Sequence, residues 1–185
     1  MMYLLDSNVF IEAKNWYYSF EICPGFWEWL DSVFLKGHVA SIIEVYHELI
    51  RGQDDLARWV KERKKHDIFL DVADKNTQKA YSEIAIAVQS GIYSDSAKIN
   101  FFKNADPWLI AKAMSTSATV VTHEVLNLET KRKVPIPNLC KEFGVPYINT
   151  FDLLRTHGTP FVLGFATGTA YPDPRRTPKR LTRQG

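Results

Sequence analysis

Short apolar runs alternate along this chain with stretches of helical period, and this alternation constrains the fold more than any other feature of the sequence. Five runs have the length of strands, namely 3–5, 38–40, 68–70, 118–122 and 147–150. The fourth run, Ala118–Thr122, is continuous and β-branched, which is typical of parallel strands buried on both faces. The alternation therefore predicts an α/β fold, a three-layer α/β/α sandwich with a central parallel sheet.

Two local motifs predict where helices begin. Ser41-Ile42-Ile43-Glu44 matches the capping box, in which the serine hydroxyl accepts from a backbone amide and the glutamate reaches back, and this helix is expected to run to about Gly52. Asn104-Ala105-Asp106-Pro107 predicts another start, with the aspartate at the cap and the proline at the first helical position. Further helices are expected over 26–35 and 77–89.

Composition and charge divide the chain into two parts. Its 185 residues are 45% hydrophobic and 24% charged, which excludes collagen-like, low-complexity and wholly disordered proteins. Residues 157–185 are rich in glycine and proline and carry five basic residues against one acid, a net charge of +4. Residues 1–156 carry eighteen basic and twenty acidic residues, a net charge of −2. We expect a domain over 1–156 and a weakly ordered basic tail over 157–185.

The sequence favours a cytoplasmic protein without contact to a membrane. No apolar run approaches the roughly 20 residues of a membrane span, and the amino terminus lacks the basic and apolar segments of a secretory signal. Cys23 and Cys140 are therefore expected to be free thiols, and neither has the C-x-x-C spacing of a zinc knuckle.

Acidic residues follow the predicted strands or stand on the first turns of the next helices. They are Asp6, Glu44 or Glu48, Asp106 and Glu124. The carboxyl ends of parallel strands lie along one edge of a sheet, so these acids are expected to converge there. Packed carboxylates repel one another unless a cation neutralises them, and all-oxygen sites suit Mg²⁺ or Mn²⁺. This chemistry favours metal-dependent hydrolysis of a phosphodiester.

The second acid is chosen between two glutamates on one helical face. Glu44 has a local task in the predicted capping box, whereas Glu48, one turn further on, has none. We therefore favour Glu48. Taken singly, Asp6 and Asp106 are as well explained as helix caps, and only their joint placement at strand–helix junctions favours a site.

Four segments resemble the motifs of the PIN-domain ribonuclease family. They are Leu4–Val9, Glu48–Gly52, Ala105–Ala113 and Val120–Glu124. Pro24–Leu30 and Ile136–Cys140 further resemble a PIN-like branch of uncharacterised function, DUF4411, which is grouped with toxins of bacterial toxin–antitoxin pairs. The resemblance covers roughly residues 2–155.

This resemblance implies a PIN-like fold and a metal-dependent endoribonuclease that cuts RNA, with a cognate antitoxin as partner and a homodimer as the usual assembly. Asp6, Glu48 and Asp106 match the three central acids of the family. Glu124 takes the fourth position, where aspartate or asparagine is the common residue. The four acids are thus the expected catalytic residues and ligands of Mg²⁺ or Mn²⁺.

Several neighbours of these acids have two interpretations each. Asn8 and Thr122 either orient carboxylates or stabilise turns. Lys131-Arg132-Lys133 either holds RNA phosphates or is a solvated loop. His123 and His47 lie beside candidate acids in sequence and are either proton donors or incidental.

Two other functions compete with the ribonuclease. A phosphatase of the haloacid-dehalogenase type also begins with a strand and an aspartate, but it needs a second aspartate where this chain has Asn8. A non-catalytic PIN-like module that binds RNA or protein stays as the alternative.

Overall fold

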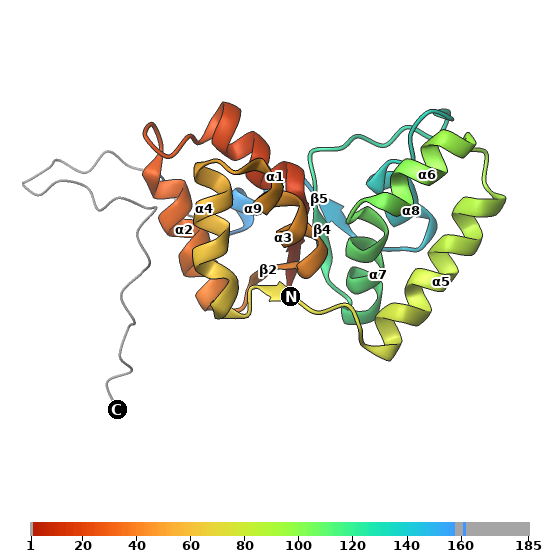
Figure 1. The fold of residues 1–185 in the computed structure, drawn as a ribbon, viewed down its shortest axis with the longest axis horizontal. Helices are drawn as coiled ribbons and strands as arrows, with labels where there is room; N and C mark the ends of the chain where they lie inside the picture. The colour runs from red at the N-terminus through yellow and green to blue at the C-terminus, as the bar shows by residue number, and fades with distance from the viewer. Residues whose placement is uncertain (1, 158–160, 162–185) are drawn as a thin grey trace, which may run out of the picture.

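A computed structural model describes residues 2–157 and 161 of the chain, and these residues contain one parallel sheet of five strands (Figure 1). The sheet order is β3-β2-β1-β4-β5, and every neighbouring pair is parallel. The strands are β1 (Tyr3–Leu5), β2 (Val39–Ile42), β3 (Phe69–Leu70), β4 (Thr119–Val121) and β5 (Tyr147–Ile148). The predicted parallel sheet is confirmed.

Helices connect the strands. The α-helices are α1 (Ser7–Glu12), α2 (Pro24–Leu35), α3 (Ile43–Leu49), α4 (Asp55–Arg63), α5 (Lys75–Ser90), α6 (Asp95–Lys103), α7 (Asp106–Thr116), α8 (Ile136–Glu142) and α9 (Thr150–His157). A π-helical turn, η1 (Ala13–Tyr17), continues α1, and two 3₁₀ turns, η2 (Ile50–Gly52) and η3 (Lys64–His66), continue α3 and α4. The sequence analysis did not predict α6 or α9.

The central strand, β1, is buried on both faces. Tyr3, Leu4 and Leu5 are at most 8% exposed. Leu4 stands opposite Ala40 of β2 on one side and Val120 of β4 on the other. A strand in this position needs apolar residues pointing both ways, which explains the continuous apolar runs of the sequence.

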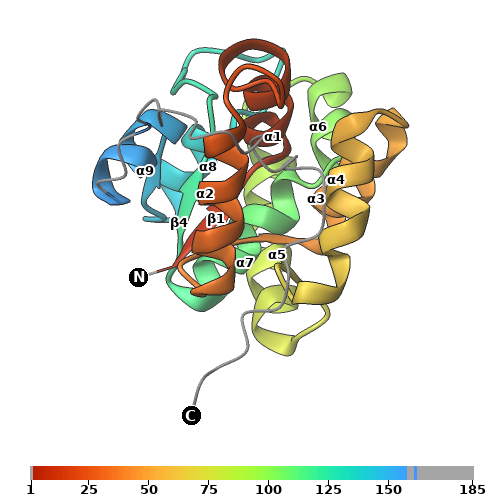
Figure 2. The same cartoon turned by 90° about the vertical axis from the view of Figure 1, so that its left-hand side faces the viewer.

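Helices cover both faces of the sheet, as the sandwich prediction requires. On one face, α7 packs against β2 and β4, and α5 packs against α7. On the other face, α2 packs against β2 and lies in front of β1 when the molecule is turned (Figure 2). Figure 1 shows α5, α6, α7 and α8 to the right of the sheet and α1, α2 and α4 to its left.

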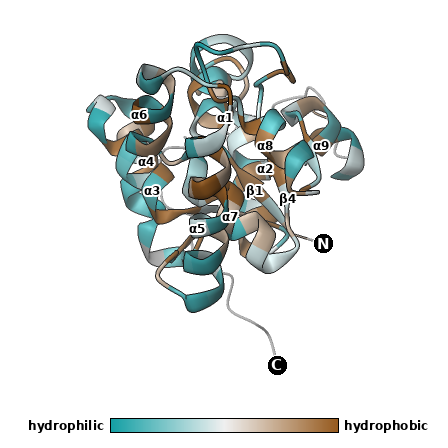
Figure 3. Cartoon of the chain, turned by 90° about the vertical axis from the view of Figure 1, so that its right-hand side faces the viewer, coloured by the Kyte–Doolittle hydropathy of each residue, from teal (hydrophilic) through white to brown (hydrophobic). Residues whose placement is uncertain are grey.

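Large aromatic residues fill much of the core. The rings of Trp27 and Trp59, both fully buried, meet edge to face with centroids 4.9 Å apart. Figure 3 shows hydrophobic residues gathered around β1 and α7, with hydrophilic residues toward the outside. Trp16 and Tyr17, in η1, are two of the exceptions, with exposed fractions of 79% and 50%.

The predicted capping box is wrong. Ser41 lies within β2, and its hydroxyl donates to the carbonyl of Leu5 over 2.6 Å instead of capping a helix. The next helix has Ile42 as its N-cap without a side-chain cap bond. The sheet prevails here because Ser41 is fully buried between two neighbouring strands, β1 and β3.

Two further findings concern the ends of elements and of the chain. Asp106 is the first residue of α7 and Ala105 is its N-cap, one residue earlier than predicted. Apart from His157 and Phe161, the predicted tail over 157–185 lies outside the described residues. Within the part of the chain that the structure describes, no helix is both long and apolar enough to cross a bilayer.

The buried ion pair between α2 and α4 provides a test of the fold. The Arg63 side chain is 1% exposed and binds Asp31 through two hydrogen bonds, of 2.5 and 2.7 Å. We expect Asp31→Ala to lower the free energy of unfolding by about 3 kcal/mol, because it removes the two charge-assisted hydrogen bonds that Asp31 accepts from a buried guanidinium. Arg58→Ala, which breaks an exposed pair with Asp55, should cost less than about 1 kcal/mol. Urea denaturation measures both, and equal losses would contradict this assignment.

Candidate active site

Asp6 lies where β1 passes into α1, at the centre of the sheet. Its backbone amide donates to the carbonyl of Val121 in β4 over 3.0 Å, so the residue sits between the ends of two neighbouring strands. It is the N-cap residue of α1, but its carboxylate makes no cap bond and is therefore available for other partners. The capping interpretation of Asp6 does not account for its side chain.

The Asp6 carboxylate is almost fully buried and receives hydrogen bonds from three side chains. Thr122 donates to Oδ2 over 2.9 Å, and Asn8 donates to the same oxygen over 3.3 Å. Ser7 donates to Oδ1 over 3.3 Å. Thr122 Oγ1 also accepts from the backbone amide of Glu124 over 3.1 Å. Asn8 and Thr122 thus both donate to a carboxylate, which is one of the two interpretations that the sequence left open for them.

The structure separates the two candidate glutamates of α3. Glu48 Oε1 accepts from the backbone amide of Ala105 over 2.7 Å, which places it beside the start of α7. Burial first, and then the charge of Asp71, raise the pKa of Glu44, and its buried Oε2 has no hydrogen-bond partner among the described residues. Glu48 is therefore the glutamate that joins the other acids. The choice made from the capping box had a wrong premise, since that motif does not form.

Asp106 begins α7 without making a side-chain cap bond. Burial first, and then the charges of Asp6, Glu124 and Glu48, raise its pKa to about 8. Burial likewise raises the pKa of Asp6 to about 6, with Thr122 opposing and the charges of Glu124 and Glu48 adding to the rise. The four predicted acids therefore share one electrostatic environment. From here on we call Asp6, Glu48, Asp106 and Glu124 the acid cluster.

Glu124 is bound on both of its oxygens. Lys133 donates a short hydrogen bond to Oε1, and the backbone amide of Ile136 donates to Oε2 over 2.8 Å. Lys133 also lowers the pKa of Asp106, so it offsets part of the negative charge. As they stand, no three acidic, histidine or cysteine side chains of residues 2–157 are arranged to hold a metal ion. The acids are brought together without forming a closed coordination shell.

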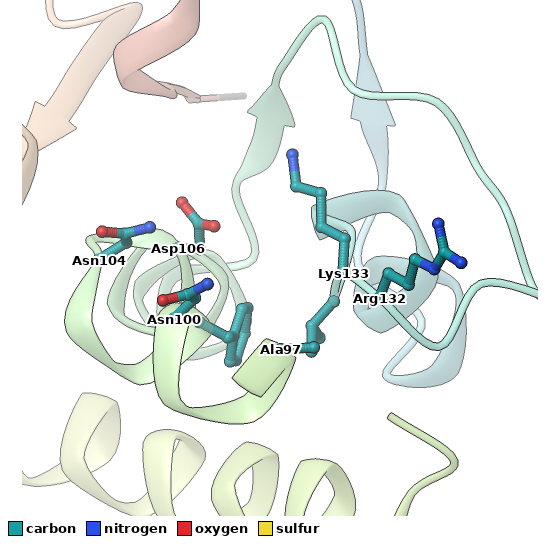
Figure 4. A pocket seen from close by; sticks show the side chains of 8 residues that line it. Ala97, Asn100, Asn104, Asp106, Arg132 and Lys133 are labelled. Atoms are coloured by element: carbon teal, nitrogen blue, oxygen red, sulfur yellow. The ribbon is translucent and has the colours of Figure 1, made fainter. Parts of the chain in front are cut away.

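A pocket of about 340 Å³ opens beside Asp106 (Figure 4). Asn100, Asn104 and Asp106 line one wall, and Arg132 and Lys133 line the other. Lys131 is exposed on the same loop as these two basic residues. The pocket therefore presents amide, carboxylate and cationic groups next to the acid cluster.

The two histidines near the acids in sequence have other contacts. His123 Nε2 lies 2.8 Å from the Thr150 hydroxyl, and its ring stacks on Tyr17 with centroids 6.0 Å apart. Its Nδ1 lies 3.7 Å from a Glu12 oxygen. His47 is exposed, with its ring edge against Tyr46. These contacts explain both imidazoles without a role at the acid cluster.

Some groups of the site were missed by the sequence analysis. The Ala105 amide that binds Glu48 is a backbone group with no signal of its own. Asn100 and Asn104 stand in or beside α6, a helix that the analysis did not predict. The sequence signal that could have indicated them is the position of Asn104, directly before the Ala105-Asp106-Pro107 motif.

Comparison with known proteins places the chain in a family. The model of a family described as a domain of unknown function, DUF4411, matches residues 3–161. The chain belongs to the DUF4411 family. The resemblance to this branch is thereby confirmed. A search of curated proteins found no match.

Two solved structures share the fold of this DUF4411 chain. One is VapBC2 from Rickettsia felis bound to a DNA fragment from its promoter, and the other is VapBC-1 from nontypeable Haemophilus influenzae. Each is 15% identical with a TM-score of 0.50, over 80% of this chain and 98% of the other. The parallel sheet and its flanking helices are PIN-like, as the sequence predicted.

The raised pKa values predict how the stability of the metal-free protein depends on pH. Asp6 and Asp106 bind protons more tightly in the folded chain than in the unfolded one, where carboxyl pKa values are near 3.8. The free energy of unfolding should therefore fall as pH rises from about 4 to about 8. Asp106→Asn should flatten this fall and gain on the order of 2 kcal/mol at pH 8 in the presence of EDTA.

Asp67→Asn is the matched control for this measurement. Asp67 is exposed, and its left-handed backbone, with φ of 55°, accommodates asparagine. Urea denaturation at several pH values should show the same fall of the free energy of unfolding with pH in this variant as in the unmodified protein. If Asp106→Asn also left this fall unchanged, the buried acids would not be its cause.

Proposed function

We propose that this protein is a metal-dependent endoribonuclease and the toxin of a bacterial toxin–antitoxin pair. One observation carries the proposal, namely four acids from separate elements, two of which, Asp6 and Asp106, have pKa values raised by burial and by the charges of the others, beside a pocket with basic residues. Carboxylates that repel in this way favour a cation, and a cation so held attracts a phosphodiester. The PIN-like fold and the family motifs agree with this chemistry.

The donor set of the acid cluster fits a hard divalent cation. All candidate ligands are carboxylate oxygens, which suit Mg²⁺ and Mn²⁺ and disfavour soft metals. Lys133 is a single positive charge against four acids, so the cluster keeps an excess of negative charge. When bound, such an ion would activate a water molecule for attack on phosphorus and stabilise the leaving oxygen.

The residues of the chain have distinct tasks in this proposal. Asp6 is the fixed ligand, because Thr122 and Asn8 hold its carboxylate in one orientation. The Ala105 amide does the same for Glu48. Asp106 faces the pocket without a cap bond and would lie nearest to the substrate.

The substrate is proposed to be RNA whose phosphates contact the loop after β4. Lys131, Arg132 and Lys133 are exposed there, and two of them line the pocket beside Asp106. Cations at this place would orient a phosphate backbone along the acid cluster. Residues 1–156 have a sequence charge of −2, so attraction for RNA would depend on the bound metal and on this loop.

A protein antitoxin is the proposed partner. The structural neighbours are VapBC assemblies, and the family resemblance is to toxins of such pairs. The resemblance also implies a homodimer, which we retain as a prediction.

A non-catalytic PIN-like module is the second candidate. It is favoured by the finding that no three acids of residues 2–157 are arranged around one ion as they stand. Such a module has no reason to bind Mn²⁺ through these carboxylates. Calorimetry with Mn²⁺ therefore separates the two functions before any substrate is known.

The two glutamates of α3 provide a matched pair of variants. We expect Glu48→Gln to lower Mn²⁺ affinity and RNA cleavage at least tenfold, because it removes a charge from the acid cluster. Glu44→Gln removes the same charge from the same helix but away from the cluster, and it should change either quantity less than twofold. Calorimetry and cleavage of a labelled RNA measure the two effects. Equal effects would contradict the assignment.

Asp6→Asn and Asp106→Asn test the catalytic proposal itself. Each should abolish Mn²⁺-dependent cleavage while the circular dichroism spectrum stays that of the folded protein. Mapping the ends of the cleaved RNA then identifies the position of the cut. Cleavage retained in the highly purified double variant would overturn the ribonuclease assignment.

A further inference from the structure

Lys133 has a second set of contacts that RNA binding does not explain. Its ammonium group pairs with Glu124 and lies in the field of Asp106 and Asp6. A lysine that serves only as a phosphate contact has no need to face three carboxylates.

The backbone around Lys133 is fixed on both sides. Upstream, the carbonyl of Lys131 accepts from the amide of Ser94 over 2.8 Å. Downstream, the amide of Ile136 donates to Glu124 over 2.8 Å, and Asn138 donates to the carbonyl of Asn127 over 2.7 Å. The loop is therefore held to α8 and to the turn before α6.

The side chain of Lys133 is much less constrained than its backbone. It is 60% exposed, whereas the side chain of its partner Glu124 is 9% exposed. Rotation of the lysine side chain toward solvent leaves every backbone hydrogen bond of the loop in place. The ammonium group can thus leave Glu124 without unfolding of the loop.

The Lys133–Glu124 ion pair occupies a carboxylate oxygen that a metal ion would need. Both oxygens of Glu124 are bound, one by Lys133 and one by the Ile136 amide. A divalent cation bound by Glu124, Asp106 and Asp6 would be attracted by the same three carboxylates that attract the Lys133 ammonium group. The two positive charges would therefore repel each other. Binding of a divalent cation by Glu124 therefore requires the Lys133–Glu124 pair to open.

We propose that Lys133 is a built-in counter-ion of the acid cluster, which a divalent cation must displace from Glu124. The inference rests on the proposed metal-dependent function. Without metal, the lysine offsets part of the repulsion among the carboxylates and keeps Glu124 bound. With metal, the two cations compete, so Lys133 sets how much divalent ion the protein needs.

Calorimetric titration with Mn²⁺ alone tests the proposal on the full chain. Lys133→Met removes the competing charge and should tighten Mn²⁺ binding about tenfold, the factor that corresponds to about 1.4 kcal/mol. Lys131→Met removes the same charge from an exposed position of the same loop and should change affinity less than twofold. Lys133→Arg keeps the charge and should stay within about threefold of the unmodified protein.

Labelling of lysine amines provides a second measurement that does not depend on a variant. Acetic anhydride followed by mass spectrometry should modify Lys133 faster in saturating Mn²⁺ than in EDTA, because the released amine is no longer bound by Glu124. The rate at Lys131 should stay the same under both conditions. A Lys133 rate that does not rise would overturn the displacement.

The outcomes distinguish this inference from the proposed function. If the unmodified protein binds no Mn²⁺, the metal-dependent function fails and the counter-ion role fails with it. If the unmodified protein binds Mn²⁺ but Lys133→Met binds it no more tightly than Lys131→Met, only the counter-ion role is overturned.

Discussion

Repulsion among carboxylates at one edge of the sheet is the constraint on which the rest of this structure depends. A parallel sheet with helical crossovers brings the carboxyl ends of its strands together, and in this chain acids stand at or beside those ends. Burial increases the cost of each charge, as the pKa of about 8 for Asp106 shows. The hydroxyl of Thr122, the amide of Ala105 and the ammonium of Lys133 each offset part of that cost.

The position of the site follows from the order of the strands. From β1 at the centre, the chain first forms β2 and β3 on one side of the sheet. It then returns past β1 and forms β4 and β5 on the other side. Ligand sites in such sheets lie at this switch point. Asp6 directly follows β1 there, and the hydroxyl of Thr122, which directly follows β4, donates to it over 2.9 Å. The strand ladder that stabilises the fold thereby also fixes the most buried carboxylate.

Most of the fold and the identity of the acids could be predicted from the sequence, because both depend on local patterns. Apolar runs such as Ala118–Thr122 indicate buried parallel strands, and acids just beyond such runs converge through topology alone. The local motif at Ser41 was misleading, since its pattern fits a capping box while the sheet uses the hydroxyl. Local rules fail where a residue is fully buried between strands, because tertiary contacts then decide its partners.

Contacts within irregular segments could not be predicted. Glu124 and Lys133 are nine residues apart in a loop with no helical or strand period, and only the folded path of the loop brings them together. The same holds for Glu48 and the Ala105 amide, which are 57 residues apart and belong to different helices. Pairs of this kind depend on how elements pack, and no spacing rule encodes them.

Asp6 and Glu124 differ in how firmly they are held, and the difference lies in the groups that surround each carboxylate. Asp6 is short, emerges from the sheet and is surrounded by donors on neighbouring elements. Glu124 lies in the loop after β4 instead, and its carboxylate is bound by the Ile136 amide and by a largely exposed lysine. An acid bound by donors on neighbouring elements at the end of the sheet favours a fixed ligand, whereas an acid bound by a loop and an exposed cation favours an exchangeable one. Glu124 is thus the acid of the cluster whose charged partner has solvent to turn into.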